Sequence, residues 1–291
     1  MVLQRTVQNR ALHMINRIKL IGVDVDGTLL DSSGRMPAAN CQAIHDAVSA
    51  GIHVAIVTGR SYPSARPIVD RLPSSISLIV SNGAVERGMD GSMIARRLLD
   101  RRVARAVLDG TRPFRAAAAL IFDRDAERQV IFETMDWEHP ARKGYWGRNQ
   151  ALIGQAVPLE DALTEDPIQV MFNGGVMEMR PLYEMLRLEL RDVAVSLTEY
   201  LHRDFSLVDV TAPNATKGSA LAWRARQLGV APENVMAVGD NFNDTEMLEF
   251  AGTPVVMGNA VAGLKERGWH VTGDQNEAGL AQAIARFALH P

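Results

Sequence analysis

Two acidic residues follow the first apolar run of the chain at a spacing suited to catalysis. The run 18–23 leads directly into Asp24-Val-Asp26-Gly27-Thr28. Side chains two residues apart on an extended segment share a face, so the carboxylates of Asp24 and Asp26 are expected to point the same way. Two like charges this close need a cation between them, or one of them must keep a proton. The pattern therefore predicts a carboxylate nucleophile assisted by a metal ion and an acid/base partner.

Three later segments carry further polar groups at the ends of apolar runs or at the start of a helix. The apolar run 54–57 is followed by a threonine, a glycine and an arginine, and the run 235–238 is followed by a second group of acidic and amide side chains. A lysine precedes the helical stretch 219–228. A lysine at a helix start is mildly opposed by the helix dipole, which itself indicates a functional reason for it. The residues at these positions are Thr58, Gly59, Arg60, Lys217, Asp240, Asn243 and Asp244.

The two flanking parts of the chain alternate between strand-like and helix-like segments, which predicts a parallel sheet with helices on both faces. Strands are expected near 18–25, 53–58, 77–81, 235–239 and 254–257, and helices near 38–50, 63–72, 217–228, 243–251, 261–268 and 276–288. Open sheets of this kind bind ligands at the carboxyl ends of their strands, where these polar residues are expected to lie.

From about residue 86 to 204, the predicted strands and helices no longer alternate regularly. Segments 117–122 and 129–134 are predicted to be paired strands around a short turn, followed by strands at 168–172 and 193–197 and a helix at 178–190. Strands joined by a short turn are antiparallel, so this part is expected to be an α+β insertion.

The order DxDGT, Thr-Gly-Arg, lysine and GDxxND resembles the motifs of the haloacid dehalogenase-like (HAD) phosphohydrolase superfamily. The segments 81–84 and 256–260 also resemble its Cof-type branch, class IIB. The resemblance covers residues 18–84 and 205–288. It implies an α/β fold, in which a Rossmann-like, HAD-type parallel-sheet core (1–85 and 205–291) carries an inserted α+β cap domain of the C2 type (86–204) that determines substrate specificity.

The resemblance also implies roles for individual residues. Asp24 would attack phosphorus to form an aspartyl-phosphate, and Asp26 would be the general acid/base. Thr58 and Lys217 would complete the catalytic set. Phosphate binding would involve Thr28, Thr58, Gly59, Asn82, Lys217 and Asn243. Mg²⁺ would be held by Asp24, the backbone carbonyl of Asp26 and Asp240, and Asp244 would complete the metal site through metal-bound water or would bind Lys217.

Several residues keep two interpretations. Arg60 suits either a salt bridge behind the site or a substrate contact, and Asn82 suits either phosphate binding or an Asn-Gly turn. Asp209 suits either a structural or a substrate-facing role. The arginines of segment 96–115 would either attract anionic substrates or form a solvated helix face. An aromatic loop, Trp137, His139, Tyr145 and Trp146, would either close over a substrate ring or anchor the insertion or a dimer contact.

These expectations lead to a Mg²⁺-dependent phosphatase that hydrolyses small phosphomonoesters, such as sugar phosphates or phosphorylated cofactors. A phosphomutase of the phosphomannomutase type and a non-catalytic binding protein on the same fold are the alternatives. The partner is therefore expected to be a small-molecule phosphate ester, and the chain a monomer or homodimer.

Composition fits an enzyme of this kind. The chain has 291 residues, 47% hydrophobic and 22% charged, with a net charge of −3 that argues against nucleic-acid binding. Cys41 is the only cysteine, which favours a reducing, cytoplasmic location, and no apolar run is long enough for a membrane helix. Residues 1–16 are interpreted as a frayed or artificially long N-terminal segment, with Met14 as an alternative start residue. A transit peptide is the less favoured interpretation.

Overall fold

The apolar run after residue 17 forms the central strand of a sheet. The computed structural model describes residues 18–124 and 127–289, so the expectations for residues 1–16 lie outside the described residues. The chain divides into unit 1 (residues 1–80, 86–94 and 217–291) and unit 2 (residues 81–85 and 95–216). Within the described residues, no helix is both long and apolar enough to cross a bilayer.

Unit 1 is built on an eight-stranded sheet with the order β14-β13-β12-β1-β2-β3-β4-β5. The ladders from β14 through β3 are all parallel, which confirms the predicted α/β class. Central strands of such a sheet are covered on both faces, and β1, β3 and β12 are accordingly buried along their whole length. The strands are β1 (Leu20–Val23), β2 (His53–Val57), β3 (Ser77–Val80), β4 (Val85–Gly88), β5 (Met93–Arg96), β12 (Val235–Gly239), β13 (Thr253–Val256) and β14 (His270–Val271).

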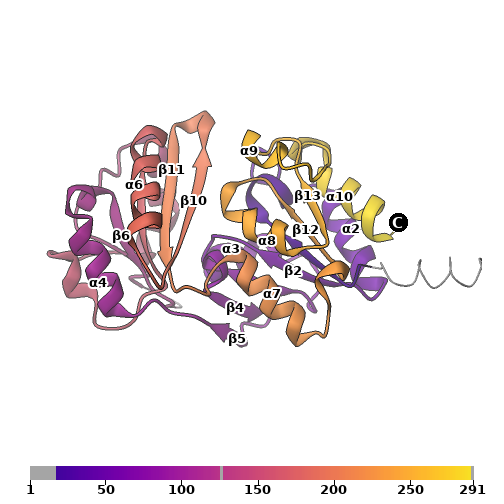
Figure 1. The fold of residues 1–291 in the computed structure, drawn as a ribbon, viewed down its shortest axis with the longest axis horizontal. Helices are drawn as coiled ribbons and strands as arrows, with labels where there is room; N and C mark the ends of the chain where they lie inside the picture. The colour runs from indigo at the N-terminus through magenta and orange to yellow at the C-terminus, as the bar shows by residue number, and fades with distance from the viewer. Residues whose placement is uncertain (1–17, 125–126, 290–291) are drawn as a thin grey trace, which may run out of the picture. The chain divides into compact units, whose positions relative to one another are not determined.

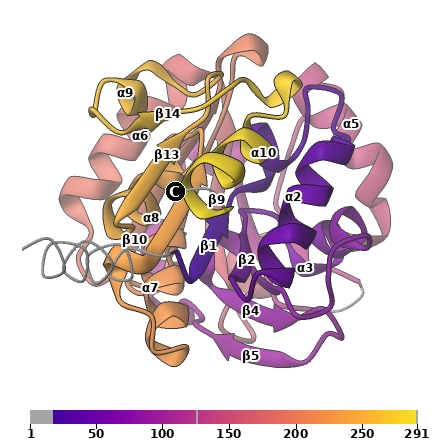
Figure 2. The same ribbon diagram turned by 90° about the vertical axis from the view of Figure 1, so that its right-hand side faces the viewer.

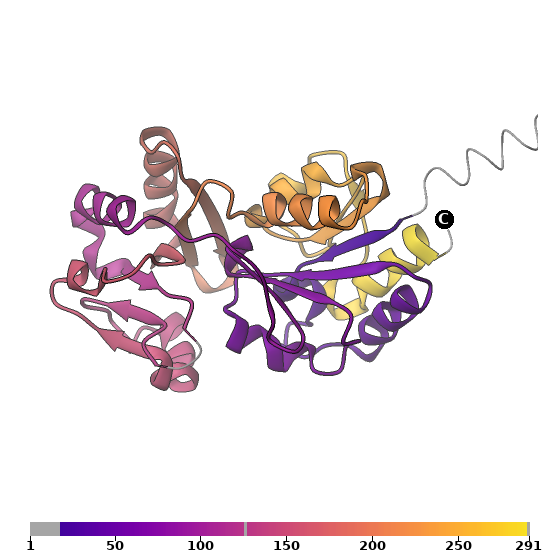
Figure 3. The ribbon, with the colours of Figure 1, turned by 90° about the horizontal axis from the view of Figure 1, so that it is seen from below.

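Helices lie on both faces of this sheet (Figures 2 and 3). Helix α2 packs against α10 on one face, and α7 packs against α8 on the other. The apolar side chains of α7, α8 and the strands form a continuous core. The helices are α2 (Ala38–Ser49), α3 (Tyr62–Ala65), α7 (Lys217–Gln227), α8 (Thr245–Phe250), α9 (Ala262–Lys265) and α10 (Gly279–Ile284).

Several predicted helices are shorter than expected, including the one near 261–268, which is only the four residues of α9. The sequence predicts a helix near 63–72, but the structure has the single turn α3 followed by a 3₁₀ turn at Arg66–Val69. Pro67 explains the interruption, because proline lacks the N–H that a continuing helix would use.

Unit 2 contains a six-stranded sheet with the order β10-β11-β9-β6-β7-β8. The antiparallel pair β6–β7 confirms the predicted paired strands. Helices α4 and α6 contact this sheet, and Figure 1 shows α6 beside β10 and β11. The elements are β6 (Ala118–Ile121), β7 (Val130–Phe132), β8 (Ile153–Gln155), β9 (Gln169–Gly174), β10 (Ala194–Tyr200), β11 (Phe205–Thr211), α4 (Arg101–Gly110), α5 (Pro140–Asn149) and α6 (Val176–Glu189).

The boundaries of the units differ from the predicted 86 and 204. Residues 86–94 belong to unit 1 because β4 and β5 extend its sheet. Residues 205–216 belong to unit 2 because β11 pairs with both β9 and β10.

Candidate active site

Two aspartates leave neighbouring parallel strands at the same edge of the unit 1 sheet. Strands β1 and β12 are paired in register, with Val23 opposite Val238, and the Asp24 backbone N–H donates to the Val238 carbonyl at 3.1 Å. Asp24 and Asp240 therefore follow directly after adjacent strand ends. Parallel strands place their carboxyl ends together, so residues far apart in sequence meet there.

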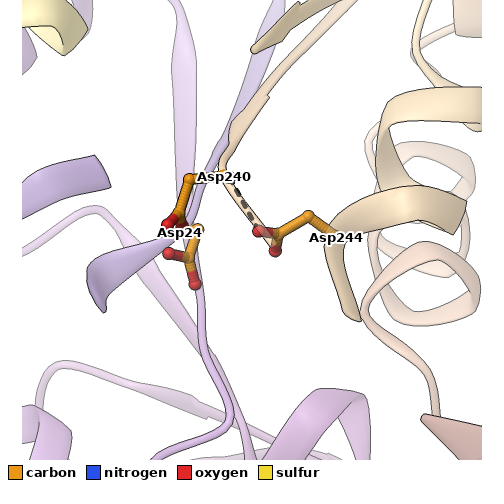
Figure 4. A group of neighbouring side chains, drawn as sticks. All are labelled: Asp24, Asp240 and Asp244. Carbon is orange, nitrogen blue, oxygen red and sulfur yellow. Dashed lines mark hydrogen bonds between the residues drawn. The ribbon is translucent and has the colours of Figure 1, made fainter. Parts of the chain in front are cut away.

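A third carboxylate completes a compact acidic cluster. Candidate ligand oxygens of Asp24, Asp240 and Asp244 all lie within 4.8 Å of one another. In Figure 4, the carboxylates of Asp24 and Asp240 lie side by side, and that of Asp244 reaches toward them from the start of a helical segment. One Asp244 oxygen accepts from the backbone N–H groups of Asp240 and Asn241, both at 3.0 Å, which fixes its position.

Lys217, the first residue of α7, is buried inside this cluster. Its Nζ donates to Asp24 Oδ1 at 2.6 Å and to Asp244 Oδ1 at 2.7 Å, and its side chain is 1% exposed. Burial alone would lower the pKa of Lys217, but the charges of Asp24 and Asp244 outweigh it and raise the pKa above the usual value. The lysine is therefore held as a cation beside the Asp24 carboxylate.

The acidic cluster carries more negative charge than Lys217 can neutralise. Burial raises the pKa of Asp24 to about 7, and repulsion from Asp244 and Asp26 adds to this while Lys217 opposes it. The pKa of Asp240 is also raised well above its usual value, by burial first and then by Asp24 and Asp244. A divalent cation would relieve both effects, and clustered carboxylate oxygens are the ligands that Mg²⁺ prefers. The arrangement of Asp24, Asp240 and Asp244 thus fits a magnesium ion.

We expect the metal-free protein to lose stability as the pH rises from 3.8, the ordinary pKa of an aspartate, toward about 7. In this interval folded Asp24 keeps a proton that the unfolded chain has released, so raising the pH favours unfolding. Thermal denaturation in chelator across this interval measures the effect. Added Mg²⁺ should stabilise the protein most at the upper end, and Asp24→Asn should flatten the pH dependence. A free energy of unfolding that rises from pH 5 to pH 7 in chelator would contradict the assignment.

The carboxylate of Asp26 is held by Arg60. Arg60 Nε donates to Asp26 Oδ2 at 2.7 Å, and its Nη2 donates to Oδ1 at 2.6 Å. This two-bond geometry orients a carboxylate more strictly than a single contact does. Of the two interpretations of Arg60, the salt bridge is therefore the one that the structure contains.

The turn between Asp26 and Thr28 depends on a glycine. Gly27 has φ +88°, and a Cβ atom there would lie 2.2 Å from Asp240 Oδ2. Only glycine combines this conformation with such a close approach. Thr28, fully buried, directs its hydroxyl toward Asp240 Oδ1 at 3.5 Å, at the outer limit of a hydrogen bond.

Asn259 supports the same turn and was not among the predicted site residues. Its side-chain amide donates to the Gly27 carbonyl at 2.8 Å and accepts from the Gln275 backbone N–H at 2.9 Å. The two residues are 232 positions apart, so no local pattern predicts the contact itself, although Asn259 lies in segment 256–260, which resembles the Cof-type branch.

The remaining predicted phosphate-binding residues fall into both units. Thr58 is buried directly after β2, followed by exposed Gly59, and Asn243 lies in the 3₁₀ turn Phe242–Asp244 beside the acidic cluster. Asn82, in contrast, belongs to unit 2. Its side-chain amide donates to Asp209 Oδ2 at 2.8 Å.

The arginines of segment 96–115 are largely engaged with nearby acids. Arg102 pairs with Asp100 at 2.6 Å and Arg112 with Asp109 at 3.0 Å. Arg115 pairs with Glu160 at 2.5 Å. These ion pairs favour the interpretation that the arginines form a solvated helix face over the interpretation that they attract anionic substrates.

Part of the predicted aromatic loop is helical, because Tyr145 and Trp146 lie in α5, while Trp137 packs on strand β7. The Trp137 ring meets Phe132 edge-on at 5.1 Å between centroids and lies against Trp146 at 5.0 Å. Tyr145 is 39% exposed. Trp137 thus anchors this segment to the sheet and Trp146 packs on Trp137, while the predicted contact with a substrate ring stays a prediction.

Comparison with known proteins agrees with this geometry. Residues 21–284 match a family model described as haloacid dehalogenase-like hydrolase. The 5-amino-6-(5-phospho-D-ribitylamino)uracil phosphatase YcsE of Bacillus subtilis is 28% identical over 274 residues, covering 94% of this chain and 96% of that protein. The HMP-PP phosphatase of Cronobacter sakazakii is 28% identical over 278 residues, covering 94% and 97%.

A solved structure also shares the fold. A haloacid dehalogenase-like hydrolase from B. subtilis has a TM-score of 0.78 to this chain at 23% identity, over 92% of this chain and 99% of that one. Because the family model spans nearly the whole chain, and its matched region contains the cluster of Asp24, Lys217, Asp240 and Asp244, the protein belongs to the haloacid dehalogenase-like hydrolases.

Proposed function

We propose that the protein is a Mg²⁺-dependent phosphatase that hydrolyses small phosphomonoesters through a phosphorylated Asp24. The observation that carries this proposal is the buried contact between Asp24 and Lys217 inside an acidic cluster suited to a divalent cation. A carboxylate so placed is an anionic nucleophile beside a fixed positive charge, which is the arrangement that phosphoryl transfer requires.

In the first step, an Asp24 oxygen forms a bond to phosphorus while the bond from phosphorus to the leaving oxygen breaks. Lys217 stabilises the negative charge of the transferring group from its position 2.6 Å from Asp24 Oδ1. Thr58, Gly59, Thr28 and Asn243 are assigned to the phosphoryl oxygens. Mg²⁺, held by Asp24, Asp240, Asp244 and the Asp26 carbonyl, would neutralise charge on the phosphoryl group.

Asp26 is assigned to proton transfer in both steps. It gives a proton to the departing oxygen and later takes one from the water that hydrolyses the acyl phosphate, which releases inorganic phosphate and restores Asp24. Arg60, bonded to both Asp26 oxygens, is assigned to hold this carboxyl group in position between the steps.

Asp26→Ala should affect natural alkyl phosphates far more than aryl phosphates. An alkoxide is a poor leaving group and needs the proton, whereas 4-nitrophenolate leaves without it. We expect a loss of about 100-fold or more in kcat/KM for an alkyl phosphate, and a clearly smaller loss for 4-nitrophenyl phosphate. Equal losses for the two substrates would show that Asp26 only positions other groups.

The substrate is proposed to be a small molecule whose leaving group contacts the inserted unit. Every phosphomonoester presents the same phosphoryl group to Asp24, so discrimination must come from residues that meet the leaving group. One relative is named for a phosphorylated ribitylaminouracil, which makes a ring-bearing leaving group a reasonable first test.

Screening the purified protein with Mg²⁺ against a phosphomonoester panel tests the proposal. Release of inorganic phosphate from an aryl phosphate would distinguish a phosphatase from a binding protein on the same fold. A requirement for a bisphosphate activator would instead indicate a phosphomutase. No release from any ester in the panel would contradict the proposed function.

A further inference from the structure

A turn at residues 257–261 lies between β13 and α9 and is attached to the end of β12. The Met257 N–H donates to the Gly239 carbonyl at 3.1 Å, and the Val261 N–H donates to the Asp240 carbonyl at 3.0 Å. Gly239 is the last residue of β12, and Asp240 follows it directly. Both ends of the turn are therefore held by the backbone that positions the Asp240 carboxylate.

The side chain in the middle of this turn reaches the segment that follows β1. Asn259 Nδ2 donates to the Gly27 carbonyl at 2.8 Å, and Asn259 Oδ1 accepts from the Gln275 N–H at 2.9 Å. Each end of the amide thus faces the backbone group that it can bind, which fixes the orientation of the side chain. One asparagine therefore connects the turn after β1 to the backbone that carries Asp240.

The backbone behind Asn259 is closely packed. The Gly258 N–H donates to the Gly273 carbonyl at 3.1 Å. A Cβ atom on Gly258 would lie 3.0 Å from the Asp274 backbone nitrogen, and one on Gly279 would overlap the Gly273 carbonyl. Packing of this density resists displacement, so Asn259 is held on a rigid support.

The turn that receives the hydrogen bond contains a residue with few steric restrictions. Gly27 has φ +88°, and glycine reaches several other backbone conformations at little cost. Asp26, whose carbonyl is assigned to Mg²⁺, directly precedes Gly27. A Cβ atom on Gly27 would overlap the Asp240 carboxylate, so this turn and Asp240 are in close contact. A change in the Gly27 dihedral angles would therefore alter the distance between the Asp26 carbonyl and the Asp240 carboxylate.

We propose that Asn259 is a positioning residue that sets this distance and thereby determines the affinity for Mg²⁺. The inference rests on the proposed function, which assigns both oxygens to the metal, and deepens it. Mg²⁺ demands near-ideal octahedral geometry, so a shift of one ligand relative to another lowers the affinity. Groups that orient metal ligands without touching the ion typically change metal affinity by about 10–100-fold when they are removed.

Asn259→Asp separates positioning from charge, because the two effects have opposite signs. Aspartate keeps the oxygen that accepts from Gln275 but replaces the donor with an oxygen that faces the Gly27 carbonyl. Its added negative charge alone would strengthen the binding of a cation. We expect the dissociation constant for Mg²⁺ to rise about tenfold instead. Calorimetric titration of the metal-free full-length protein with Mg²⁺ alone measures it.

Asn259→Ala removes the hydrogen bond without adding charge and should also weaken Mg²⁺ binding about tenfold. At saturating Mg²⁺, kcat for 4-nitrophenyl phosphate should fall by about tenfold or more with a smaller change in KM, because the reacting groups are misaligned while Asn259 makes no substrate contact in this account. Thr272→Val is the matched control. It removes the bond from the Thr272 hydroxyl to the Gly279 carbonyl at 2.7 Å, behind Asn259 and away from Gly27. This control should lower Tm but keep the Mg²⁺ affinity and turnover of the wild type.

The inference would be overturned by a folded Asn259→Ala protein that binds Mg²⁺ as tightly as the wild type. Tighter binding by Asn259→Asp, or equal losses of affinity in Asn259→Ala and Thr272→Val, would also overturn it. If Asn259→Ala does not fold, Asn259→Asp, which keeps the bond to Gln275, decides alone. A wild-type protein that does not bind Mg²⁺ would contradict the inference as well. A wild-type protein that binds Mg²⁺ but hydrolyses no phosphate ester would instead refute the proposed function, while the binding comparison would still decide the role of Asn259.

Discussion

Replacing Asp24 by asparagine is expected to lower kcat for 4-nitrophenyl phosphate by about 10⁴-fold or more. Asparagine keeps the shape of the side chain and a hydrogen-bonding oxygen, but its amide cannot attack phosphorus. The substitution also removes the negative charge that Lys217 contacts at 2.6 Å. Steady-state kinetics at saturating Mg²⁺ measures the loss.

The variant should fold, because it relieves part of the repulsion within the buried acidic cluster. Asp46→Asn, at an exposed aspartate of α2, is the matched control and should retain wild-type activity. An Asp24→Asn enzyme with a tenth of the wild-type turnover would rule out Asp24 as the nucleophile.

Removal of divalent metal is expected to abolish activity, and Mg²⁺ should restore it. Asp24, Asp240 and Asp244 lie too close together to act as three ionised carboxylates, two of them buried and one half-buried, with only Lys217 as a counter-charge. Without the cation, Asp24 has a pKa of about 7 and is partly protonated at neutral pH, so it is a poor nucleophile.

Replacing Mg²⁺ by Ca²⁺ tests whether activity depends on the geometry of the bound metal ion and not only on its charge. Ca²⁺ has longer bonds to oxygen and a higher coordination number than Mg²⁺, so it should occupy the cluster and misalign Asp24. Activity measured after chelation and titration with each metal should recover with Mg²⁺ and stay low with Ca²⁺. Full turnover in excess chelator would contradict the metal assignment of these three aspartates.

Local patterns in the sequence predicted the parallel core well. Strands β1, β2, β3 and β12 are four or five residues long and apolar apart from His53 and Ser77, and each lies within a predicted segment. Such apolar runs can be recognised in the sequence without knowing their neighbours, because a buried parallel strand is apolar on both faces. The positions of Asp24 and Asp240 directly after strand ends followed from the same pattern, whereas the pairing of β1 with β12 did not.

Strand β11 was not predicted, and its residues alternate only in part, since Leu207 and Val208 are both apolar. Phe205–Thr211 was placed at the start of the core, whereas it pairs antiparallel with β9 and β10 in unit 2. Its polar members, Ser206, Asp209 and Thr211, are all buried, so the usual contrast between an apolar and a solvated face is weak.

Contacts between residues far apart in the sequence could not be predicted from local patterns. Lys217 is 193 residues from Asp24, and only the order of motifs along the chain indicated that they meet. The pairing of Arg60 with Asp26 was one of two open interpretations, and the contact from Asn259 to Gly27 was not predicted. These contacts depend on which strands lie side by side, which the residues near each motif do not encode.

The most direct test of the account is to trap the phosphorylated enzyme. Wild-type protein with Mg²⁺ and 4-nitrophenyl phosphate, quenched in acid during turnover and digested, should yield one phosphorylated peptide. Mass spectrometry should assign the phosphoryl group to Asp24, and hydroxylamine should remove it, as expected for an acyl phosphate. Steady release of phosphate with the phosphoryl group on another residue, or an Asp24→Asn protein that is labelled as well as wild type, would contradict the central claim.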